Sequence, residues 1–558
     1  MKQLNRLWSY TKQYTNMLLV SLVSAAFFGI ISAVPTYFLK KVVDDIFVQK
    51  HHQLIIPMAL FLVFIFACKG FFSFLTTYTM HWVGNRVVND IRSDLFVSVM
   101  RYPLRFFQAT TTGQLMSHFL NDVQMMQNAA SATIKNGVRS LFETIFLITF
   151  AFMQNWQLAF MMMVVGPAMG IIIKKMGASI KRSSGKIQQE VGTLSDQLQE
   201  TFSGIREVKA FNAEKYHIDR FNQQLSRFFE ETMRYVRAEA LLPALIEVVT
   251  MIGAALAFYV AAQQVLKGYI TPGQLTSFIA AALLAYAPMK RLINVYGEIQ
   301  YALAAADRVF SLMDRIQPAQ QEGKILSLVG QINFNNVSFS YGADKKIFNN
   351  LDLVFRKGER IGIVGPSGSG KSTFIDLLLG FITPTEGNIT IDAQLLTMTT
   401  AIQWRQQVGY VGQRPFLFND TVKNNIIYGR SALQDQQIHV AIKASDAYDF
   451  VQELAQGCNT MLGENGNLLS GGQRQRLTIA RALAGQPQLL IFDEATASLD
   501  AASEDEIKLT LQSLPMDATV IIVTHRASLL EIVDRVFLVE NECINEIQKA
   551  QVSNTVTI

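Results

Sequence analysis

The chain has 558 residues, of which half are hydrophobic and only 17% are charged. A soluble protein of this length carries more charge on its surface, so the composition indicates that lipid surrounds much of the chain. The formal charge of +5 is too small to indicate nucleic-acid binding, and we expect no nucleic-acid partner. The three cysteines, Cys68, Cys458 and Cys543, are far apart and predict neither a disulfide framework nor a zinc site.

Six apolar segments, each close to the length that crosses a bilayer, follow a short amphipathic N-terminal stretch. Two connections between them, residues 80–137 and 175–240, are long, charged and helical in pattern, so we expect helices that continue into water. The second connection is rich in lysine and arginine, which predicts that the long connections and both chain ends are cytoplasmic. The predicted spans are residues 17–39, 54–79, 138–154, 157–174, 241–265 and 275–297.

The composition changes sharply near residue 316. After this point short β-branched runs alternate with charged helical segments, a pattern typical of an α/β domain. Residues 316–323 are polar, contain proline and glycine, and predict a linker. We therefore predict a multidomain chain with an all-α six-helix transmembrane domain over residues 1–315, a linker over 316–330 and an α/β domain over 331–558.

A phosphate-binding loop is predicted between an apolar strand and a helix in the segment IGIVGPSGSGKSTFID, residues 361–376. Its glycines allow backbone N–H groups to turn toward phosphates, Lys371 can reach the β- and γ-phosphates of ATP, and Ser372 can hold Mg²⁺. A glycine-rich turn without a ligand is the alternative, but strand, Lys-Ser-Thr and helix follow in the order that the motif requires. The nucleotide-binding residues predicted here are Gly365, Ser367, Gly368, Gly370, Lys371, Ser372 and Thr373.

Two acidic residues end the apolar segment LLIFDE, residues 489–494. At a phosphate site, a buried strand of this kind offers Asp493 to Mg²⁺ and Glu494 to polarise the attacking water. Many strands end in acids without such a role, so the phosphate-binding loop upstream is what favours the catalytic interpretation.

A second phosphate-binding turn is predicted where the sequence LSGGQ, residues 469–473, opens a helix. The alternative is an ordinary helix N-cap formed by Ser470 with nothing bound. The residues that would contact nucleotide are Ser470, Gly471, Gly472 and Gln473.

From about residue 331 to 540 the chain resembles the ATPase domain of ABC transporters, in which LSGGQ is the signature motif. The resemblance implies roles for three further motifs. Tyr341, in VSFSYG, matches the aromatic residue that stacks on adenine. Gln413, in YVGQRPFLF, matches the Q-loop glutamine that senses Mg²⁺ and contacts the membrane domain, and residues 463–466 match the exporter X-loop.

The same resemblance implies that two chains cooperate, because the family's signature motif serves the nucleotide held by the partner's phosphate-binding loop. Asp500, in SLD, matches the D-loop, and His525, in IIVTHR, matches the switch histidine near the γ-phosphate. With Glu494 as the expected acid, we predict a homodimer in which both sites hydrolyse ATP, while pairing with a related chain stays open. After Val539 the chain departs from the family, since the usual glycine-containing turn and final helical tail are missing.

The membrane half resembles exporter-type (type IV) ABC membrane domains. The segments RFF, TGQLMS and ND within residues 105–122 match that family's first cytoplasmic loop, and residues 204–211 match the second. In the family, short helices in these loops dock on the nucleotide-binding domains near the Q-loop. ATP-driven closure would then swing the long helices from an inward-open to an outward-open state. Plain solvated helices are the alternative for these loops.

Three basic residues lie in or beside the predicted spans, where charge is costly and usually functional. Lys69, Arg139 and Lys290 all fall in the predicted cytoplasmic half of the membrane and could form a cationic ring for an anionic headgroup. Snorkelling by Arg139 is one alternative. Internal pairing is another, with the acidic residues Glu143, Glu247 and Glu298.

The sequence around these basic residues resembles the bacterial lipid A flippases, in the segments CKGFFSFLTTY, VRSLFE and APMKRLINVYGEIQ. In that family the basic positions bind the phosphorylated sugars of the lipid. The resemblance implies ATP-driven flipping of an amphipathic lipid, of lipid A or lipopolysaccharide-core type, across the bacterial inner (plasma) membrane. A multidrug exporter of hydrophobic compounds is the main alternative. An ATP-gated channel or regulatory subunit is a further one, which Glu494 disfavours because a gate needs no fast hydrolysis.

Overall fold

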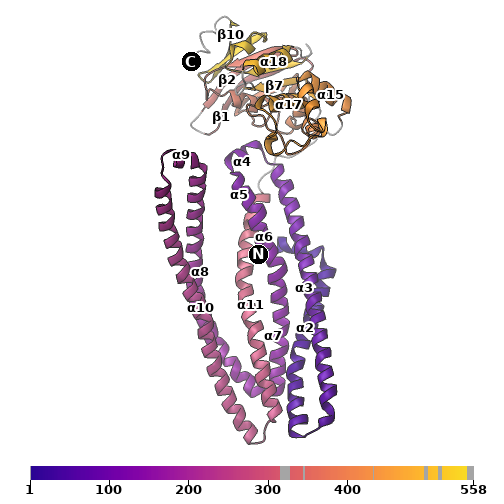
Figure 1. The fold of residues 1–558 in the computed structure, drawn as a ribbon, viewed down its shortest axis with the longest axis vertical. Helices are drawn as coiled ribbons and strands as arrows, with labels where there is room; N and C mark the ends of the chain where they lie inside the picture. Colours follow the sequence, from indigo (N-terminus) through magenta and orange to yellow (C-terminus); the bar gives the residue numbers. More distant parts are fainter. Residues whose placement is uncertain are drawn as a thin grey trace. The chain divides into compact units, whose positions relative to one another are not determined.

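The computed structural model describes residues 2–314, 327–342, 346–430, 433–495, 501–512 and 518–549. These residues form two compact units, a helical unit and an α/β unit (Figure 1). The helical unit contains the described residues up to 97 together with 113–314, and the α/β unit contains 98–112 and the described residues after 314. Most of the predicted linker, residues 316–326, lies outside the described residues.

Long helices build the helical unit, and each predicted span lies within one of them, except that the second span begins one residue before its helix. The second long connection is helical too, because α8 and α10 run through it and only the short α9 (Ile205–Ala210) joins them. The N-terminal stretch forms α1 (Lys2–Lys12). The long helices are α2 (Thr15–Lys41), α3 (Ile55–Met100), α7 (Ile134–Gln154), α8 (Trp156–Ser203), α10 (Glu214–Leu266) and α11 (Pro272–Met313).

The first long connection is less regular than the second. It consists of the end of α3 and several short helical pieces before α7 begins. Two of these pieces are π-helical, η3 (His118–Asp122) and η4 (Ala129–Thr133). The α-helical pieces are α4 (Leu104–Ala109), α5 (Thr112–Ser117) and α6 (Val123–Asn128).

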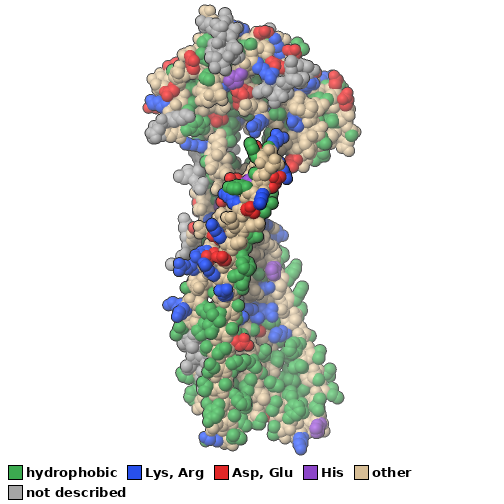
Figure 2. All heavy atoms as spheres, turned by 60° about the vertical axis from the view of Figure 1, so that its left-hand side comes forward, with side chains coloured by type: hydrophobic (Ala, Val, Ile, Leu, Met, Phe, Trp, Pro, Cys, Tyr) green, Lys and Arg blue, Asp and Glu red, His purple; other side chains and the backbone are tan. Residues whose placement is uncertain are grey.

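The surface of the helical unit is apolar over one end, where hydrophobic side chains crowd the face seen in Figure 2. Exposed apolar surface on this scale is unfavourable in water but suits a lipid environment. On α3 the exposed side chains include Leu60, Val63, Phe64, Phe71 and Phe74. Within the described residues, four helical stretches are long and apolar enough to cross a membrane, namely Thr15–Val48, His52–Met100, Thr112–Gln154 and Glu214–Leu266.

Small residues allow the helices of this unit to pack closely. A Cβ added to Gly29 on α2 would lie 2.8 Å from the backbone carbon of Phe142 on α7. Seven residues further along α2, the Ser277 hydroxyl of α11 donates a hydrogen bond to the Thr36 carbonyl over 2.6 Å. Close backbone approach and a buried hydroxyl therefore hold α2, α7 and α11 together.

The α/β unit contains two sheets. The smaller sheet is antiparallel, with the order β2–β1–β4–β5. The larger sheet has the order β10–β9–β3–β8–β7–β6, parallel except for the antiparallel edge strand β10. The strands are β1 (Gln331–Ser340), β2 (Lys346–Arg356), β3 (Arg360–Val364), β4 (Glu386–Ile391), β5 (Gln394–Leu395), β6 (Val408–Val411), β7 (Leu489–Asp493), β8 (Thr519–Val523), β9 (Arg535–Glu540) and β10 (Cys543–Ile547).

Helices cover the sheets, and an aromatic core lies between the smaller and the larger sheet. In this core the Phe355 ring packs edge-on against Phe374 of α12 and Phe537 of β9. The helices of the unit after α4 are α12 (Lys371–Leu378), α13 (Ala401–Gln406), α14 (Val422–Ile427), α15 (Asp435–Ala444), α16 (Tyr448–Glu453), α17 (Gly471–Leu483), α18 (Ala501–Gln512) and α19 (Ala527–Leu530). The predicted fold class, an all-α membrane region followed by an α/β domain, is confirmed.

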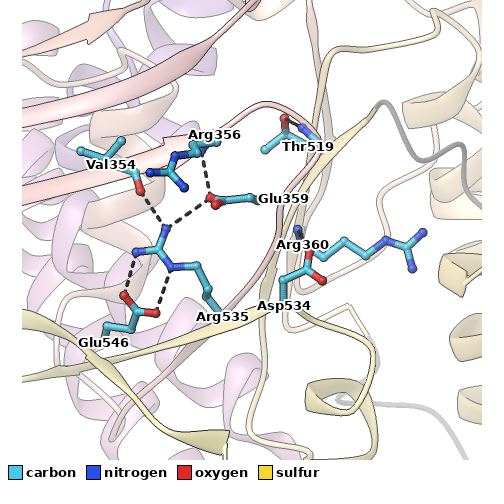
Figure 3. Close-up of polar contacts among 9 residues, drawn as sticks. Val354, Arg356, Glu359, Arg360, Thr519, Asp534, Arg535 and Glu546 are labelled. Carbon is cyan, nitrogen blue, oxygen red and sulfur yellow. Dashed lines mark hydrogen bonds and ion pairs between the residues drawn. The ribbon is translucent and has the colours of Figure 1, made fainter.

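A polar network at the edge of this core joins the two sheets (Figure 3). Arg535 on β9 forms two parallel hydrogen bonds to the Glu546 carboxylate on β10, of 2.9 and 2.7 Å. Its remaining nitrogen donates to the Val354 carbonyl of β2 and contacts Glu359, at 3.1 and 3.3 Å. One planar guanidinium thus links strands of both sheets.

The hairpin between β9 and β10 forms without glycine. Asn541 and Glu542 supply the turn in left-handed backbone conformations, with φ of 49° and 64°. The Glu542 carbonyl also accepts a hydrogen bond from the Asn349 backbone N–H over 3.0 Å. The missing glycine noted in the sequence is therefore replaced by an asparagine–glutamate turn at some cost in strain.

Candidate functional site

The phosphate-binding loop connects β3 to α12, as predicted. Gly368 and Gly370 adopt φ of 79° and 110°, which residues with a Cβ rarely reach. A Cβ on Gly370 would also lie 2.8 Å from Ile347 and 2.9 Å from Phe348. Sterics therefore require glycine at the start of α12.

Lys371 begins α12 and folds its side chain back over the loop. Its Nζ donates hydrogen bonds to the carbonyls of Gly365 and Pro366, at 2.8 and 2.9 Å. Burial lowers the pKa of Lys371, while the nearby carboxylates of Glu494 and Asp493 act in the opposite direction. The loop thus presents a buried cation beside two acids, a suitable arrangement for phosphate and a metal ion.

The other predicted nucleotide-binding residues of the loop differ in exposure. Ser367, Gly368 and Ser372 are exposed, whereas Thr373 is buried. The Thr373 hydroxyl lies 3.2 Å from the Tyr341 hydroxyl, so this hydrogen bond joins α12 to the end of β1. The structure therefore brings the predicted adenine-stacking residue to the same loop.

Tyr341 also contacts the helix α4 of the first long connection. Arg105 donates a hydrogen bond of 2.7 Å to the Tyr341 backbone carbonyl. The Tyr341 ring is partly exposed and packs edge-on against Phe339, with ring centroids 5.0 Å apart. One face of the site is thus in direct contact with a segment that joins two long helices.

Three predicted residues meet at the carboxylate of Glu494. The Gln413 amide donates to Oε2 over 2.7 Å, and His525 Nε2 lies 3.0 Å from Oε1. Gln413, Glu494 and His525 follow the adjacent parallel strands β6, β7 and β8, whose carboxyl ends meet at one edge of the sheet. Glu494 has a φ of 49°, a strained backbone of the kind often found at functional sites.

Asp493, directly before Glu494, has two neighbours that the sequence analysis missed. The Tyr410 hydroxyl donates to Asp493 Oδ2 over 3.3 Å. Burial raises the pKa of Asp493 despite this hydrogen bond, and Glu494 raises it further. Burial and then repulsion from Asp493 raise the pKa of Asp376, on α12, to about 6. Tyr410 and Asp376 lie inside the motif segments YVGQRPFLF and IGIVGPSGSGKSTFID, but the motifs give neither residue a role, so the fold is what reveals them.

The signature motif forms the start of α17. Ser470 and Gln473 form a reciprocal capping box, in which the Ser470 hydroxyl accepts from the Gln473 N–H and the Gln473 side chain accepts from the Ser470 N–H. The N-cap interpretation is thus realised, while Gly471 and Gly472 remain at least partly open to solvent. No hydrogen bond recorded for the described part of the chain joins this motif to the phosphate-binding loop. Asp500 lies outside the described residues.

Two of the three predicted basic residues of the membrane half meet on one aromatic ring. The Lys69 ammonium lies 5.2 Å and the Arg139 guanidinium 3.7 Å from the centroid of Phe28, on α2. Arg139 also donates to the Ser73 hydroxyl over 3.0 Å. Helices α2, α3 and α7 therefore bring two cations together.

An ion pair that the sequence analysis did not predict completes this cluster. Arg291 on α11 donates to the Glu143 carboxylate over 2.7 Å and to the Ser140 hydroxyl over 3.0 Å. Arg291 lies inside a predicted span, and this position could have marked it as a candidate in the sequence. Glu298 instead accepts a hydrogen bond from Thr133. We call Lys69, Arg139, Arg291 and Glu143 the membrane charge cluster.

Lys290 belongs to a different feature. It lines an apolar cleft of about 730 Å³ between α10 and α11, together with Glu247, Phe258, Phe278 and Tyr286. No hydrogen bond or ion pair is recorded for Lys290 among the residues that the structure describes. A single protomer therefore joins Lys69 to Arg139 but leaves Lys290 apart, and the three-residue ring stays a prediction.

Comparison with known proteins agrees with both halves of this description. Residues 18–289 match the family described as "ABC transporter transmembrane region", and residues 348–497 match the family described as "ABC transporter". The chain is also similar over nearly its whole length to curated proteins that are each named "ATP-dependent lipid A-core flippase".

Three such relatives illustrate the similarity. The protein from Desulfotalea psychrophila is 36% identical over 546 residues, which cover 97% of this chain and 95% of the relative. The protein from Syntrophus aciditrophicus is 35% identical, covering 97% and 90%. The protein from Haemophilus influenzae is 31% identical, covering 97% and 93%. The chain therefore belongs to the ABC transporter family, as a membrane protein that binds and hydrolyses ATP.

Proposed function

We propose that the chain uses ATP to flip an amphipathic lipid, of the lipid A or lipopolysaccharide-core type, across the bacterial inner membrane. The observation that carries this proposal is the membrane charge cluster. Three cations share a single carboxylate there, so positive charge is in excess at a place where charge is costly. A phosphorylated lipid headgroup would neutralise that excess.

The apolar cleft beside Lys290 supports an amphipathic substrate. Its walls are mostly aliphatic and aromatic, so alkyl chains would be solvated there as well as in the bilayer. Lys290 and Glu247 are the charged residues of the lining, and Lys290, for which no ion pair is recorded among the described residues, can attract an anionic group to the same region. A neutral or cationic drug would gain nothing from Lys69, Arg139 and Lys290, which favours the lipid over the multidrug alternative.

In the ATP site we assign each predicted residue a role consistent with its position. The N–H groups of the loop and Lys371 would bind the phosphates, and Tyr341 would stack on adenine. Glu494 would orient and polarise the attacking water, because Gln413 and His525 hold its carboxylate in place. His525 would also contact the γ-phosphate.

The residues beside Lys371 fit a magnesium ion. Asp493 supplies a carboxylate without an ion-pair partner among the described residues, while Ser372 and Gln413 supply a hydroxyl and an amide oxygen, all ligands that Mg²⁺ accepts. When bound, the ion would neutralise charge on the β- and γ-phosphates. The protein's own part is to hold these oxygen donors beside the loop.

A homodimer would complete the ATP site. The signature motif makes no hydrogen bond to the phosphate-binding loop of its own described chain, so its exposed N–H groups at Gly471 and Gly472 are available to a nucleotide on a second copy. ATP held between two copies would close them, and α4, in contact with Tyr341, would pass that closure to the long helices. The substrate cavity would then open alternately to the two sides of the membrane.

The test uses the full chain reconstituted in lipid nanodiscs. ATPase rate is measured against added lipid A for native protein, Lys290→Ala and Arg139→Ala. A matched control is Lys215→Ala, which removes an exposed lysine from α10 outside the predicted spans. We expect stimulation by lipid A that weakens in the first two variants only. No response to lipid A, together with stimulation by hydrophobic drugs, would sink the proposal and leave a multidrug exporter.

A further inference from the structure

A second hollow lies at the end of the helical unit where α7 turns into α8 and α10 turns into α11. Its volume is about 750 Å³. The charge pattern of the sequence predicts that these two short turns face the side opposite the cytoplasm. We call this hollow the outer cup.

The outer cup is lined by amides and aromatic rings. The Trp156, Tyr259 and Tyr269 side chains are 66%, 64% and 76% exposed and offer open ring faces. Among the described lining residues Lys267 carries the one positive charge, and none is acidic. The amides come from Gln154, Asn155, Gln157, Gln263, Gln264 and Gln274.

Hydrogen bonds between helices hold several of these amides in place. The Asn155 amide donates to the Gln264 carbonyl oxygen over 2.7 Å, and the Gln264 amide donates to Gln157 over 2.8 Å. The Asn155 oxygen also caps α8 by accepting from the N–H groups of Gln157 and Leu158. The wall of the cup is therefore ordered before any ligand arrives.

One buried acceptor in the wall lacks a partner. The Gln154 side-chain oxygen forms no hydrogen bond within the part of the chain that the structure describes. A buried amide oxygen without a partner costs about 1–3 kcal/mol, which a hydroxyl donor from a ligand or water would recover. This observation is independent of the exposed rings and points to a hydroxyl-bearing occupant.

Ordinary anchoring at the membrane surface explains only part of these features. Trp and Tyr gather at membrane–water boundaries, and lysines extend toward the headgroups. Such anchoring accounts for Trp156, Tyr259, Tyr269 and Lys267. It requires neither a hollow nor an ordered set of amides between two turns.

We propose that the outer cup binds the sugar portion of a glycolipid as the lipid leaves the transporter, which rests on the proposed flippase function. Sugar rings present C–H faces that pack on aromatic rings and hydroxyls that both donate to and accept from amides. Lys267 pairs with a phosphate or carboxylate carried by the sugar. The cup thus favours a lipid with an extended sugar headgroup over one with a small headgroup.

The test compares two lipids in nanodiscs that contain the full chain. One is lipid A alone, and the other is lipid A that carries inner-core sugars. The half-maximal concentration for ATPase stimulation is measured for native protein and for Tyr259→Ala/Tyr269→Ala. The control is Phe160→Ala, which removes an exposed ring from α8 that does not line the cup.

We expect the native protein and the control to respond to the sugar-bearing lipid at about a tenfold lower concentration than to lipid A. The double variant should respond equally to both lipids, while its response to lipid A is unchanged. The sugar-binding proposal is overturned if the native protein responds equally to both lipids, or if the double variant keeps the native preference. The lining residues would then serve only as membrane anchors. If neither lipid stimulates the native protein, the flippase function itself fails.

Discussion

The ion pair between Arg291 and Glu143 is the part of the membrane charge cluster that can be tested most directly. The Arg291 side chain is 45% and the Glu143 side chain 12% exposed, and their atoms approach to 2.7 Å. A fully buried pair costs about 3–5 kcal/mol when one partner is removed, and an exposed pair couples by about 0.2–1 kcal/mol. This pair lies between those limits, so we expect a coupling energy of about 2 kcal/mol.

The perturbation is a double-mutant cycle of Arg291→Met, Glu143→Gln and the combined variant in nanodiscs. Each single change should lower the melting temperature. The combined change should lower it by less than the sum of the two single effects, because the interaction is lost only once. The matched control is the pair Lys209–Glu214, which joins at 2.8 Å on an exposed surface and should show no measurable coupling. Additive effects of the Arg291 and Glu143 changes would refute the ion pair.

The two single variants should also move lipid affinity in opposite directions. One unit charge about 10 Å from a headgroup, at an effective dielectric constant of about 20, changes the binding energy by about 1.7 kcal/mol, or roughly tenfold. Glu143→Gln leaves more positive charge, so half-maximal stimulation should need less lipid A, whereas Arg291→Met should need more. A shift in the same direction for both would mean that stability, not charge, governs the response.

Three further predictions concern the α/β unit. Glu494→Gln should reduce the ATPase rate by about 10²–10⁴-fold while ATP binding persists, because the carboxylate that accepts from Gln413 and His525 is lost; a rate within tenfold of native would show that another residue activates the water. Asp376→Asn should stabilise the protein by about 1 kcal/mol at pH 7.5 and by about half as much at pH 5, as thermal unfolding without nucleotide would show. Because the pKa of Asp376 is raised to about 6, the ionised carboxylate destabilises the native protein. Native stability is therefore lost as the pH rises from the ordinary pKa of 3.8 through 6, and partial solvent exposure reduces the size of this loss. An equal gain at both pH values would contradict the shifted pKa. Glu542→Gly should raise stability by about 1 kcal/mol by removing strain at φ of 64°, and a loss of stability would show that the glutamate side chain itself supports the hairpin.

The strand, loop and helix around the expected ATP site could be predicted from motifs because the geometry of these motifs is local. The turn from β3 into α12 needs glycines at set positions, and the acids at the end of β7 come directly after a buried strand. Gln413, Glu494 and His525 converge because parallel strands bring their ends together, which the order of strand and loop already implies. Asp376 was missed because its neighbour Asp493 is distant in sequence and only sheet order brings them together.

The membrane half was harder to predict because hydrophobic spans carry little information about which faces meet. The helices were found by length and composition, but the facing of α3, α7 and α11 depends on small residues such as Gly29. Lys290 and Arg291 are adjacent in sequence, yet successive residues on a helix point about 100° apart. One therefore lines the cleft and the other pairs with Glu143, a distinction that a count of charges does not reveal.

The hydrogen bond from Arg105 to the Tyr341 carbonyl bears on how ATP binding and the movement of the long helices are coupled in time. The peptide unit that accepts it belongs to the residue expected to stack on adenine, so a shift of α4 would act on the backbone that carries the adenine-facing ring. Nucleotide binding and the position of α4 would then be coupled through the backbone of Tyr341. A change at position 105 would then alter ATP affinity, and by reciprocity ATP binding would alter the position of α4.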